Sequence, residues 1–361
     1  MSRPDLVHDP DPLASLLGEP RTAPLPAAGA RRVPVLLPVA LDQAYDYLLP
    51  EGMAAAPGSF VVVPFGNQKR LGVVWDRGDG GEPVAEKRLK SIDERLDIPP
   101  LPELSLRFVE WVARYTLAPR GMVLRLMMGA ATAFEPPPPK FGVRLVGQPP
   151  KRLTPGRQRV IEAARDGLIR AKSALAFAAG VTPAVVDGLV AGGTLVNVEI
   201  PREPLPRPDP AFAPPELSTG QEAAAHALRA AVDAGSFSVS LIDGITGSGK
   251  TEVYFEAVAR TLQRGQQALI LMPEIALTTG FAERFRGRFG AGAAEWHSSV
   301  SANERGRVWL AAASGEAQVV IGARSALFLP YRDLGLIVVD EEHDTAYKQD
   351  DRVAYQGRDM A

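Results

Sequence analysis

The segment Gly244–Thr251 constrains this chain more than any other part of its sequence. It reads GITGSGKT and matches the pattern G-x-x-x-x-G-K-[ST], which folds as a phosphate-binding loop between a strand and a helix. An apolar run, SVSLIDG, precedes it and predicts that strand. Backbone N–H groups of such a loop bind phosphate oxygens, its lysine contacts the β- and γ-phosphates, and its last hydroxyl ligates Mg²⁺. We therefore expect ATP and Mg²⁺ to bind at Gly244, Thr246, Gly247, Ser248, Gly249, Lys250 and Thr251.

An acidic cluster, Asp340–His343, follows a second apolar run. The carboxyl ends of parallel strands share one sheet edge, so Asp340 is expected beside the phosphate-binding loop. Asp340 would hold Mg²⁺ together with Thr251, and Glu341 would orient and deprotonate the attacking water. His343 is expected to join the ATP site and couple it to other motifs. The candidate catalytic residues are Lys250, Asp340 and Glu341.

Two further segments follow apolar runs of the same region, MPEIALT and GARSALF. Both should lie on the same sheet edge, where a strand of nucleic acid could cross. Thr278, Arg324 and Ser325 suit phosphate contacts there. By spacing alone, ordinary loops between strand and helix are an equally good interpretation.

Composition divides the rest of the chain. Residues 1–30 contain six prolines and no hydrophobic periodicity, which predicts a disordered tail, and seven prolines between 201 and 216 predict a stiff linker. Residues 31–139 carry β-branched runs and then a helix, Glu103–Thr116, and are expected to form a small β domain. The spacing of the helix predicts one buried face, formed by Leu104, Phe108, Trp111, Val112 and Tyr115. Apolar runs alternate with helical patterns in residues 217–361, which predicts a parallel sheet covered by helices.

Residues 140–200 form a basic segment. Nine basic residues lie between 140 and 172 and only two acidic ones oppose them. Three short helices and a strand suggest a winged helix. Its basic residues would either contact DNA or form the solvated face of a helical spacer, and the sequence leaves both interpretations open.

Charge and cysteine content exclude several classes of protein. The formal net charge is −2, so any contact with nucleic acid must be local. The chain has no Cys, which excludes a disulfide framework and a cysteine zinc site. The N-terminus lacks the apolar stretch of a signal peptide, and no run approaches the length of a membrane span. A cytoplasmic protein without membrane contact is expected.

Taken together, these motifs resemble those of a known family. The segments LPVALDQAYDYLLPEG, GSFVVVPFG, GITGSGKTEVY, LMPEIALT, VVIGARSALFLP and IVVDEEHDTAYKQ are similar to those of PriA (primosomal protein N′), the family of bacterial replication-restart helicases, from about Arg31 onward. The resemblance implies a multidomain α/β protein: a β-rich 3′-DNA-end-binding domain, a winged helix and one RecA-like P-loop lobe. It implies a superfamily-two 3′→5′ DNA helicase family that uses ATP and Mg²⁺ on stalled or branched forks. The single-strand DNA-binding protein and partners that load the replicative helicase would be its protein partners.

The resemblance also implies a pocket for a DNA 3′ end, at Tyr45, Asp46, Tyr47, Gly66 and Lys90. Aromatic rings can stack on any base, and Lys90 can contact a phosphate. A carboxylate accepts from a free 3′-hydroxyl but repels a phosphodiester, so Asp46 would select an end.

The sequence departs from the family in three places. Thr279-Gly280 replaces the usual Pro-Gln, and the segment Ala354–Asp359 differs from the family's Arg-Tyr-His-Ala-Arg-Asp. The second helicase lobe and the zinc-binding cysteine insert of the family have no counterpart among the 361 residues, so no zinc ligands are expected. We therefore expect binding of ATP and forked DNA without unwinding. The alternatives are a non-catalytic DNA-binding scaffold for primosome assembly and a general P-loop DNA-dependent ATPase.

Overall fold

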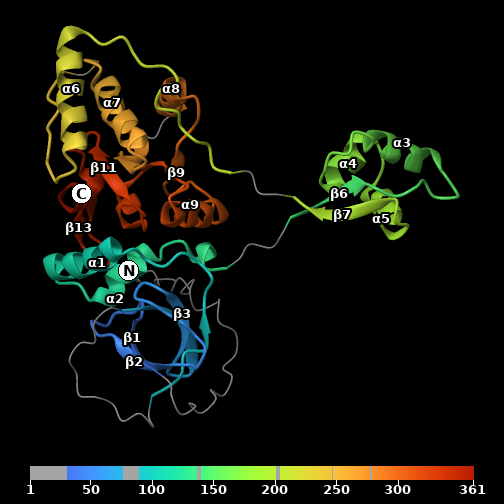
Figure 1. Cartoon of the computed structure of the whole chain (residues 1–361), viewed down its shortest axis with the longest axis horizontal. Helices are drawn as coiled ribbons and strands as arrows, with labels where there is room; N and C mark the ends of the chain where they lie inside the picture. The colour runs from blue at the N-terminus through green and yellow to red at the C-terminus, as the bar shows by residue number, and fades with distance from the viewer. Residues whose placement is uncertain (1–30, 76–88, 136–139, 201–203, 246, 277–278) are drawn as a thin grey trace, which may run out of the picture. The chain divides into compact units, whose positions relative to one another are not determined.

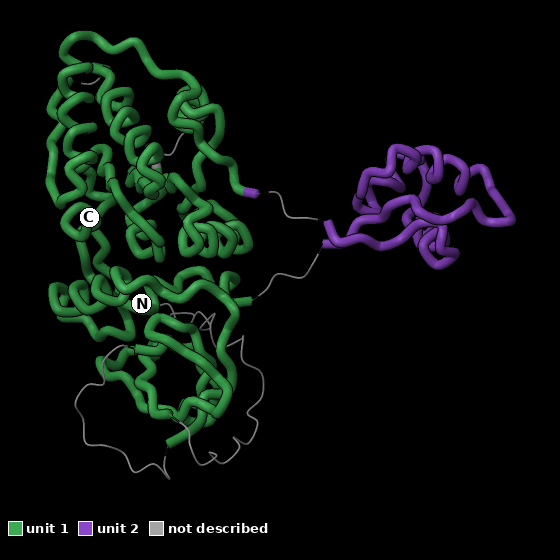
Figure 2. Tube along the Cα trace, in the orientation of Figure 1, with its two compact units in different colours: residues 1–135, 205–361 green, residues 136–204 purple. Residues whose placement is uncertain are grey.

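The computed structural model of the chain describes residues 31–75, 89–135, 140–200, 204–245, 247–276 and 279–361. The chain divides into two compact units (Figure 2). Unit 1 comprises residues 1–135 and 205–361, and unit 2 comprises residues 136–204. Because unit 1 contains both ends of the chain, unit 2 is an insertion in its sequence.

The first part of unit 1 is a five-stranded antiparallel sheet with the strand order β2-β1-β4-β3-β5 (Figure 1). Its apolar side chains alternate between two faces, and both faces are covered, so Val35, Phe60 and Val63 are all fully buried. Two helices and a short 3₁₀ turn follow the sheet. The elements are β1 (Arg31–Leu36), β2 (Tyr45–Leu49), β3 (Phe60–Phe65), β4 (Gln68–Val74), β5 (Glu94–Arg95), α1 (Glu103–Thr116), α2 (Arg120–Met127) and η2 (Ala131–Ala133).

Helix α1 forms over the predicted residues but buries a different face. Leu104, Trp111 and Tyr115 are exposed by 39% or more, whereas Leu106, Val109 and Val112 are buried. The prediction of a buried face containing Leu104, Trp111 and Tyr115 is therefore wrong. The helix carries two adjacent apolar stripes, and the stripe with the smaller side chains packs closest to the core.

The second part of unit 1 is a four-stranded parallel sheet with the order β11-β8-β10-β9 and helices around it. Strand β8 is buried along its whole length, as expected for an inner strand of a parallel sheet. The elements are α6 (Thr219–Ala234), α7 (Lys250–Gln263), β8 (Gln267–Leu271), η3 (Glu274–Ala276), α8 (Thr279–Phe289), β9 (Ala294–Trp296), α9 (Ala302–Ser314), β10 (Val319–Gly322), η4 (Arg324–Phe328), β11 (Leu334–Val339), η5 (Thr345–Tyr347), β12 (Lys348–Gln349), β13 (Tyr355–Gln356) and α10 (Gly357–Met360).

The segment before the phosphate-binding loop is not a strand, contrary to prediction. Residues 236–245 have no regular structure. Phe237, Val239 and Leu241 are each more than 80% exposed. A strand needs a neighbour that offers free backbone N–H and C=O groups, and this segment does not pair with β11, the strand at that side of the sheet.

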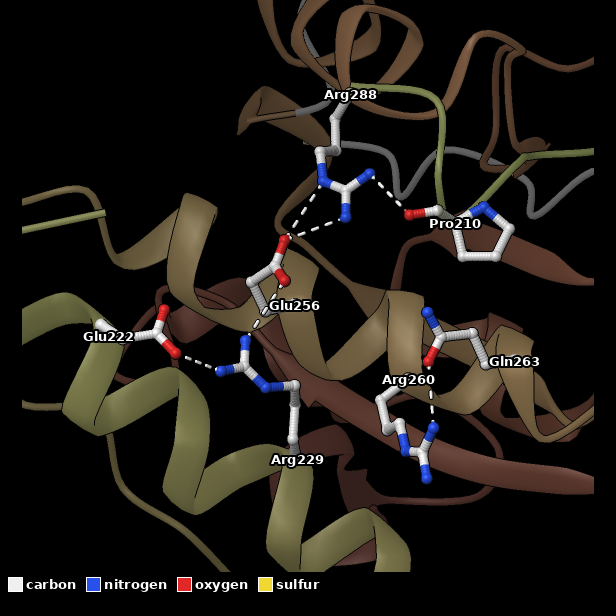
Figure 3. Close-up of polar contacts among 7 residues, drawn as sticks. All are labelled: Pro210, Glu222, Arg229, Glu256, Arg260, Gln263 and Arg288. Atoms are coloured by element: carbon white, nitrogen blue, oxygen red, sulfur yellow. Dashed lines mark hydrogen bonds and ion pairs between the residues drawn. The ribbon is translucent and has the colours of Figure 1, made fainter. Parts of the chain in front are cut away.

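A largely buried carboxylate, 13% exposed, joins the helices of the parallel-sheet part (Figure 3). Glu256 of α7 accepts hydrogen bonds from Arg288 of α8 at 2.9 Å and from Arg229 of α6 at 3.3 Å. Arg288 is almost fully buried and also donates to the carbonyl of Pro210 at 3.0 Å. Because a buried charge is costly without partners, removing either end of this network should destabilise the fold.

The two parts of unit 1 share one hydrophobic core. Trp309 of α9 is fully buried, and its ring packs edge-on against Phe60 and Phe134 at centroid distances of 5.5 and 5.0 Å. Its indole N–H donates to the carbonyl of Met127 at 2.7 Å. The antiparallel sheet and the parallel sheet are thus parts of one packed body.

Unit 2 is a small helical body closed by an antiparallel pair of strands, β6 and β7. Thr154 accepts a hydrogen bond from the N–H of Arg157 and caps the first helix, with Pro155 as its first residue. Val143, Val160 and Leu189 lie in its core. The elements are β6 (Phe141–Leu145), α3 (Pro155–Ala163), α4 (Lys172–Ala178), α5 (Pro183–Ala191) and β7 (Leu195–Glu199).

Within the described residues, no single helix is both long and apolar enough to cross a membrane. Only α4 and α5 taken together reach the required length and composition, and this pair is bent by 114°.

Candidate nucleotide and DNA-end sites

The phosphate-binding loop leads directly into α7. Gly249 adopts φ +81° and Gly247 φ +79°, a conformation that favours glycine and turns the backbone into the helix N-terminus. The ammonium of Lys250 donates to the carbonyl of Gly244 at 2.7 Å. The loop therefore has the compact form that a phosphate cradle needs. Thr246 lies outside the described residues.

Gln221 of α6 contacts this loop and was not predicted from the sequence. Its amide oxygen accepts from the N–H of Ser218 in a capping box, and its amide nitrogen donates to the carbonyl of Ser248 at 2.9 Å. The S-T-G-Q pattern predicts the cap but not the second contact, because that contact joins segments distant in sequence.

Asp340 lies at the carboxyl end of β11, beside the start of α7. Its Oδ2 accepts from the hydroxyl of Tyr254 at 2.9 Å, and its Oδ1 accepts from the N–H of Glu341 at 2.9 Å. Thr251 lies one helical turn before Tyr254 on α7. Burial, with Asp340 second, raises the pKa of Tyr254. Both predicted Mg²⁺ ligands are therefore neighbours of Tyr254: Asp340 accepts from its hydroxyl, and Thr251 lies on the same face of α7.

The residues after Asp340 are exposed. Glu341 has φ +48° and an exposed side chain, and the His343 ring nitrogen lies 3.7 Å from its carboxylate. Glu342 instead pairs with Arg358 at 2.7 Å. The Glu341 carboxylate is thus accessible to solvent, and its role in orienting water stays a prediction.

Tyr347 holds the following loop against the sheet. Its buried hydroxyl lies 2.6 Å from the carbonyl of Asp340 and 3.0 Å from that of Leu271, the last residues before the loops of β11 and β8. Arg324 donates to the carbonyls of Ala346 and Lys348 on either side of it. The loop after the acidic cluster is therefore tied to Arg324.

These contacts bear on the predicted phosphate-contacting residues. Part of the Arg324 guanidinium is occupied by backbone carbonyls, and the hydroxyl of Ser325 accepts from the indole of Trp296 at 3.1 Å. Thr278 lies outside the described residues. Contact of these three residues with DNA stays a prediction.

The residues predicted for a DNA 3′ end lie on and around β2. Lys90 donates to the carbonyl of Gly66 at 3.2 Å, and Gly66, at φ +59°, has open space where a side chain would be. Tyr45 is half-buried and packs edge-on against Phe65 at 5.2 Å. The structure therefore brings together Tyr45, Gly66 and Lys90.

Asp46 and Tyr47 are placed differently from the expectation. Tyr47 is 4% exposed and its hydroxyl donates to the carbonyl of Pro64, so it is a core residue and offers no ring face to a base. Asp46 points to the face of β2 opposite to that of Tyr45 and Tyr47, because side chains alternate along a strand. There it forms an ion pair with Arg32, which was not predicted.

Among the residues that the structure describes, no cluster of three or more His, Asp or Glu side chains could hold a metal by itself. Asp340 is hydrogen-bonded to Tyr254, one helical turn after Thr251, and a hydroxyl and a carboxylate are a donor set that fits Mg²⁺ carried by the phosphates of ATP.

Comparison with known proteins gives two domain matches. Residues 34–129 match the family model of the PriA 3′DNA-binding domain (3′BD), and residues 219–360 match that of the DEAD/DEAH box helicases.

Curated relatives extend the match along the chain. The replication restart protein PriA of Rickettsia conorii is 32% identical over 330 residues, 91% of this chain and 40% of the relative. That of Haemophilus influenzae is 32% identical over 352 residues, 91% of this chain and 46% of the relative. That of Bacillus subtilis is 40% identical over 148 residues, 41% of this chain. The chain thus spans less than half the length of these relatives.

Proposed function

We propose that this chain belongs to the PriA family of replication restart proteins and that it binds branched DNA at a free 3′ end and Mg·ATP. The observation that supports the nucleotide part is the hydrogen bond from the Tyr254 hydroxyl to Asp340, which joins the acidic cluster to the helix that begins at the phosphate-binding loop. The DNA part is supported by the match of residues 34–129 to the 3′DNA-binding domain.

The proposed division of labour follows the fold. The antiparallel-sheet part binds the DNA end near Tyr45, Gly66 and Lys90, unit 2 is a winged helix, and the parallel-sheet part is a RecA-like lobe that binds ATP. When bound, Mg²⁺ would neutralise charge on the phosphates. Lys250 would contact the β- and γ-phosphates, and Glu341 would orient water. We further propose that the protein acts on stalled forks in the cytoplasm. Its partners there would be the single-strand DNA-binding protein and the proteins that load the replicative helicase.

Two binding experiments on the full chain test this function. Fluorescence anisotropy should give a lower Kd for a fork that ends in a 3′-hydroxyl than for the same fork with a 3′-phosphate, at one fixed salt concentration. Titration calorimetry should detect ATP binding that strengthens with Mg²⁺. Equal affinity for both forks would reject the end site, and no heat of ATP binding would reject the nucleotide site.

A further inference from the structure

Unit 2 contains a helix–turn–helix whose second helix lacks the residues that read DNA. Helices α4 and α5 are joined by four residues that include Gly180 at φ +59°, and they cross at 114°. In a helix–turn–helix the second helix enters the major groove. Helix α5, however, reads PAVVDGLVA: it has no Lys, Arg, Asn or Gln, and its exposed positions include Ala184, Asp187 and Gly188. The one α5 side chain that could accept from a base edge, Asp187, is ion-paired with Lys172, so the helix offers no free side chain for base recognition.

The positive charge of unit 2 lies elsewhere. Residues 140–200 carry nine basic and four acidic side chains. Three of the acidic residues form ion pairs with basic neighbours: Glu162 pairs with Arg165, Asp166 with Arg170 and Asp187 with Lys172. The guanidinium of Arg170 lowers the pKa of Asp166 to about 2, so that pair stays charged at neutral pH. Among the described residues, the basic side chains without a carboxylate partner are Lys140, Arg144, Lys151, Arg152, Arg157 and Arg159.

Three of these six side chains gather at the connection between β6 and α3. We call residues 146–153 the basic loop. Lys151 and Arg152 are exposed at its end, and Arg157, in the first turn of α3, donates to the carbonyl of Arg152 at 3.1 Å. Pro149 and Pro150 restrict the backbone just before them. The loop therefore presents two free cations on a backbone that is held in place.

We propose that the basic loop, through Lys151 and Arg152, contacts the phosphate backbone of DNA, and that α5 does not read the major groove. The occupant is DNA because the loop offers charge without base-reading side chains, and phosphates are the feature that every DNA sequence shares. A protein that must act on forks of any sequence gains affinity from such a surface without a sequence preference. This inference rests on the proposed function, since it assumes that the chain binds DNA.

A charge-matched pair of variants tests the inference in the full chain. Lys151→Ala with Arg152→Ala removes two unpaired cations, and Arg165→Ala with Lys172→Ala removes two cations of the same unit that are already ion-paired. Both variants have the same net charge. Affinity for a forked DNA is measured by anisotropy at several salt concentrations, and circular dichroism checks the fold. All four side chains are surface-exposed or pair at the surface, so both variants should remain folded.

The loop variant should bind the fork about tenfold or more weakly at ~0.1 M salt, and the slope of log K against log[salt] should fall by about 2. The paired-cation variant should lie close to wild type. Equal loss in both variants would mean that net charge alone matters, and an unaffected loop variant would mean that the loop serves another partner; either result overturns the inference.

A third variant, Ala184→Glu, places a carboxylate on the exposed face of α5. Its fork affinity should stay near that of wild type, whereas a large loss there would identify α5 as the DNA-facing helix and reject the inference. The proposed function has a separate readout. The preference for a 3′-hydroxyl over a 3′-phosphate depends on unit 1 and should persist in the loop variant, while a wild-type chain that binds no fork at all would reject the proposed function itself.

Discussion

The hydroxyl of Tyr254 donates a hydrogen bond to Oδ2 of Asp340 at 2.9 Å, across 86 positions of the sequence. The tyrosine lies in the second turn of α7, and the aspartate follows β11. Tyr254 is buried, so it can hold the carboxylate in a fixed orientation at the place where Mg²⁺ is expected. The acidic cluster is thus joined to the nucleotide motif by Tyr254, the last residue of the segment GITGSGKTEVY, three positions beyond the phosphate-binding pattern.

Tyr254→Phe should weaken Mg·ATP binding about 3- to 10-fold, because the carboxylate loses a charge-assisted donor. Calorimetric titrations with ATP in Mg²⁺ and in EDTA should differ less for the variant than for wild type. Tyr331→Phe is the matched control: it removes a buried hydroxyl that donates to the carbonyl of Ala326, away from the site. Equal effects of the two substitutions would show that Tyr254 acts only through general stability.

Lys250→Ala should reduce ATP affinity roughly 10- to 100-fold, which corresponds to about 1.5–3 kcal/mol for a hydrogen bond to a charged group. Lys172→Ala, which removes a lysine in unit 2, should leave ATP affinity unchanged. Calorimetry measures both. Wild-type affinity in Lys250→Ala would remove the lysine from the nucleotide site.

Asp46→Ala should abolish the preference for a 3′-hydroxyl over a 3′-phosphate while leaving weak electrostatic binding to the fork. The carboxylate can accept from a hydroxyl and repels a phosphate. Because Asp46 lies on the opposite face of β2 from Tyr45 and is paired with Arg32, this variant tests whether the end is selected at that face. Anisotropy with the two forks at equal salt gives the ratio of affinities. Asp97→Ala removes an exposed carboxylate from the same domain and should keep the ratio. A ratio that is unchanged in Asp46→Ala would place end selection elsewhere.

Some features could be predicted from the sequence because they depend on local pattern. The resemblance to PriA is confirmed by the domain matches, and a β-rich first domain followed by a parallel-sheet lobe is confirmed by the fold. Other features depend on contacts between distant segments. Tyr254, Gln221 and Arg32 gain their positions from packing, and no spacing rule identifies them. The exposed stripe of α1 was misassigned because two apolar stripes give the same helical periodicity.

Trp309→Ala should destabilise unit 1 by about 3–5 kcal/mol, and Trp309→Phe by about 1–3 kcal/mol, because the carbonyl of Met127 loses its donor and a cavity forms. Urea unfolding with circular dichroism measures the change. Trp111→Phe, at a partly exposed position of α1, should cost about 0.5 kcal/mol or less. Separate transitions for the two sheets in wild type would contradict a shared core.

Alkaline pH should destabilise unit 1. Burial raises the pKa of Tyr355 to about 12 and raises the pKa values of Tyr254, Tyr331 and Tyr347 above their ordinary value of 10.0. The unfolded chain ionises first, so the contribution of these phenols to stability is complete below pH 10 and is lost as the pH rises toward 12 and beyond. Urea midpoints measured from pH 9 to 11.5 should fall above pH 10. A constant midpoint over that range would mean that these phenols are hydrated in the folded protein.

The chain leaves unit 1 after residue 135 and re-enters its hydrophobic core at residue 205. Leu205 is buried in the same hydrophobic cluster as Trp309, and its N–H donates to the carboxylate of Glu316 at 3.1 Å. The core is therefore complete on either side of the insertion, and its packing does not depend on what the insertion contains. Unit 2 can therefore be exchanged or its surface charge altered without disturbing the packing between the two sheets of unit 1.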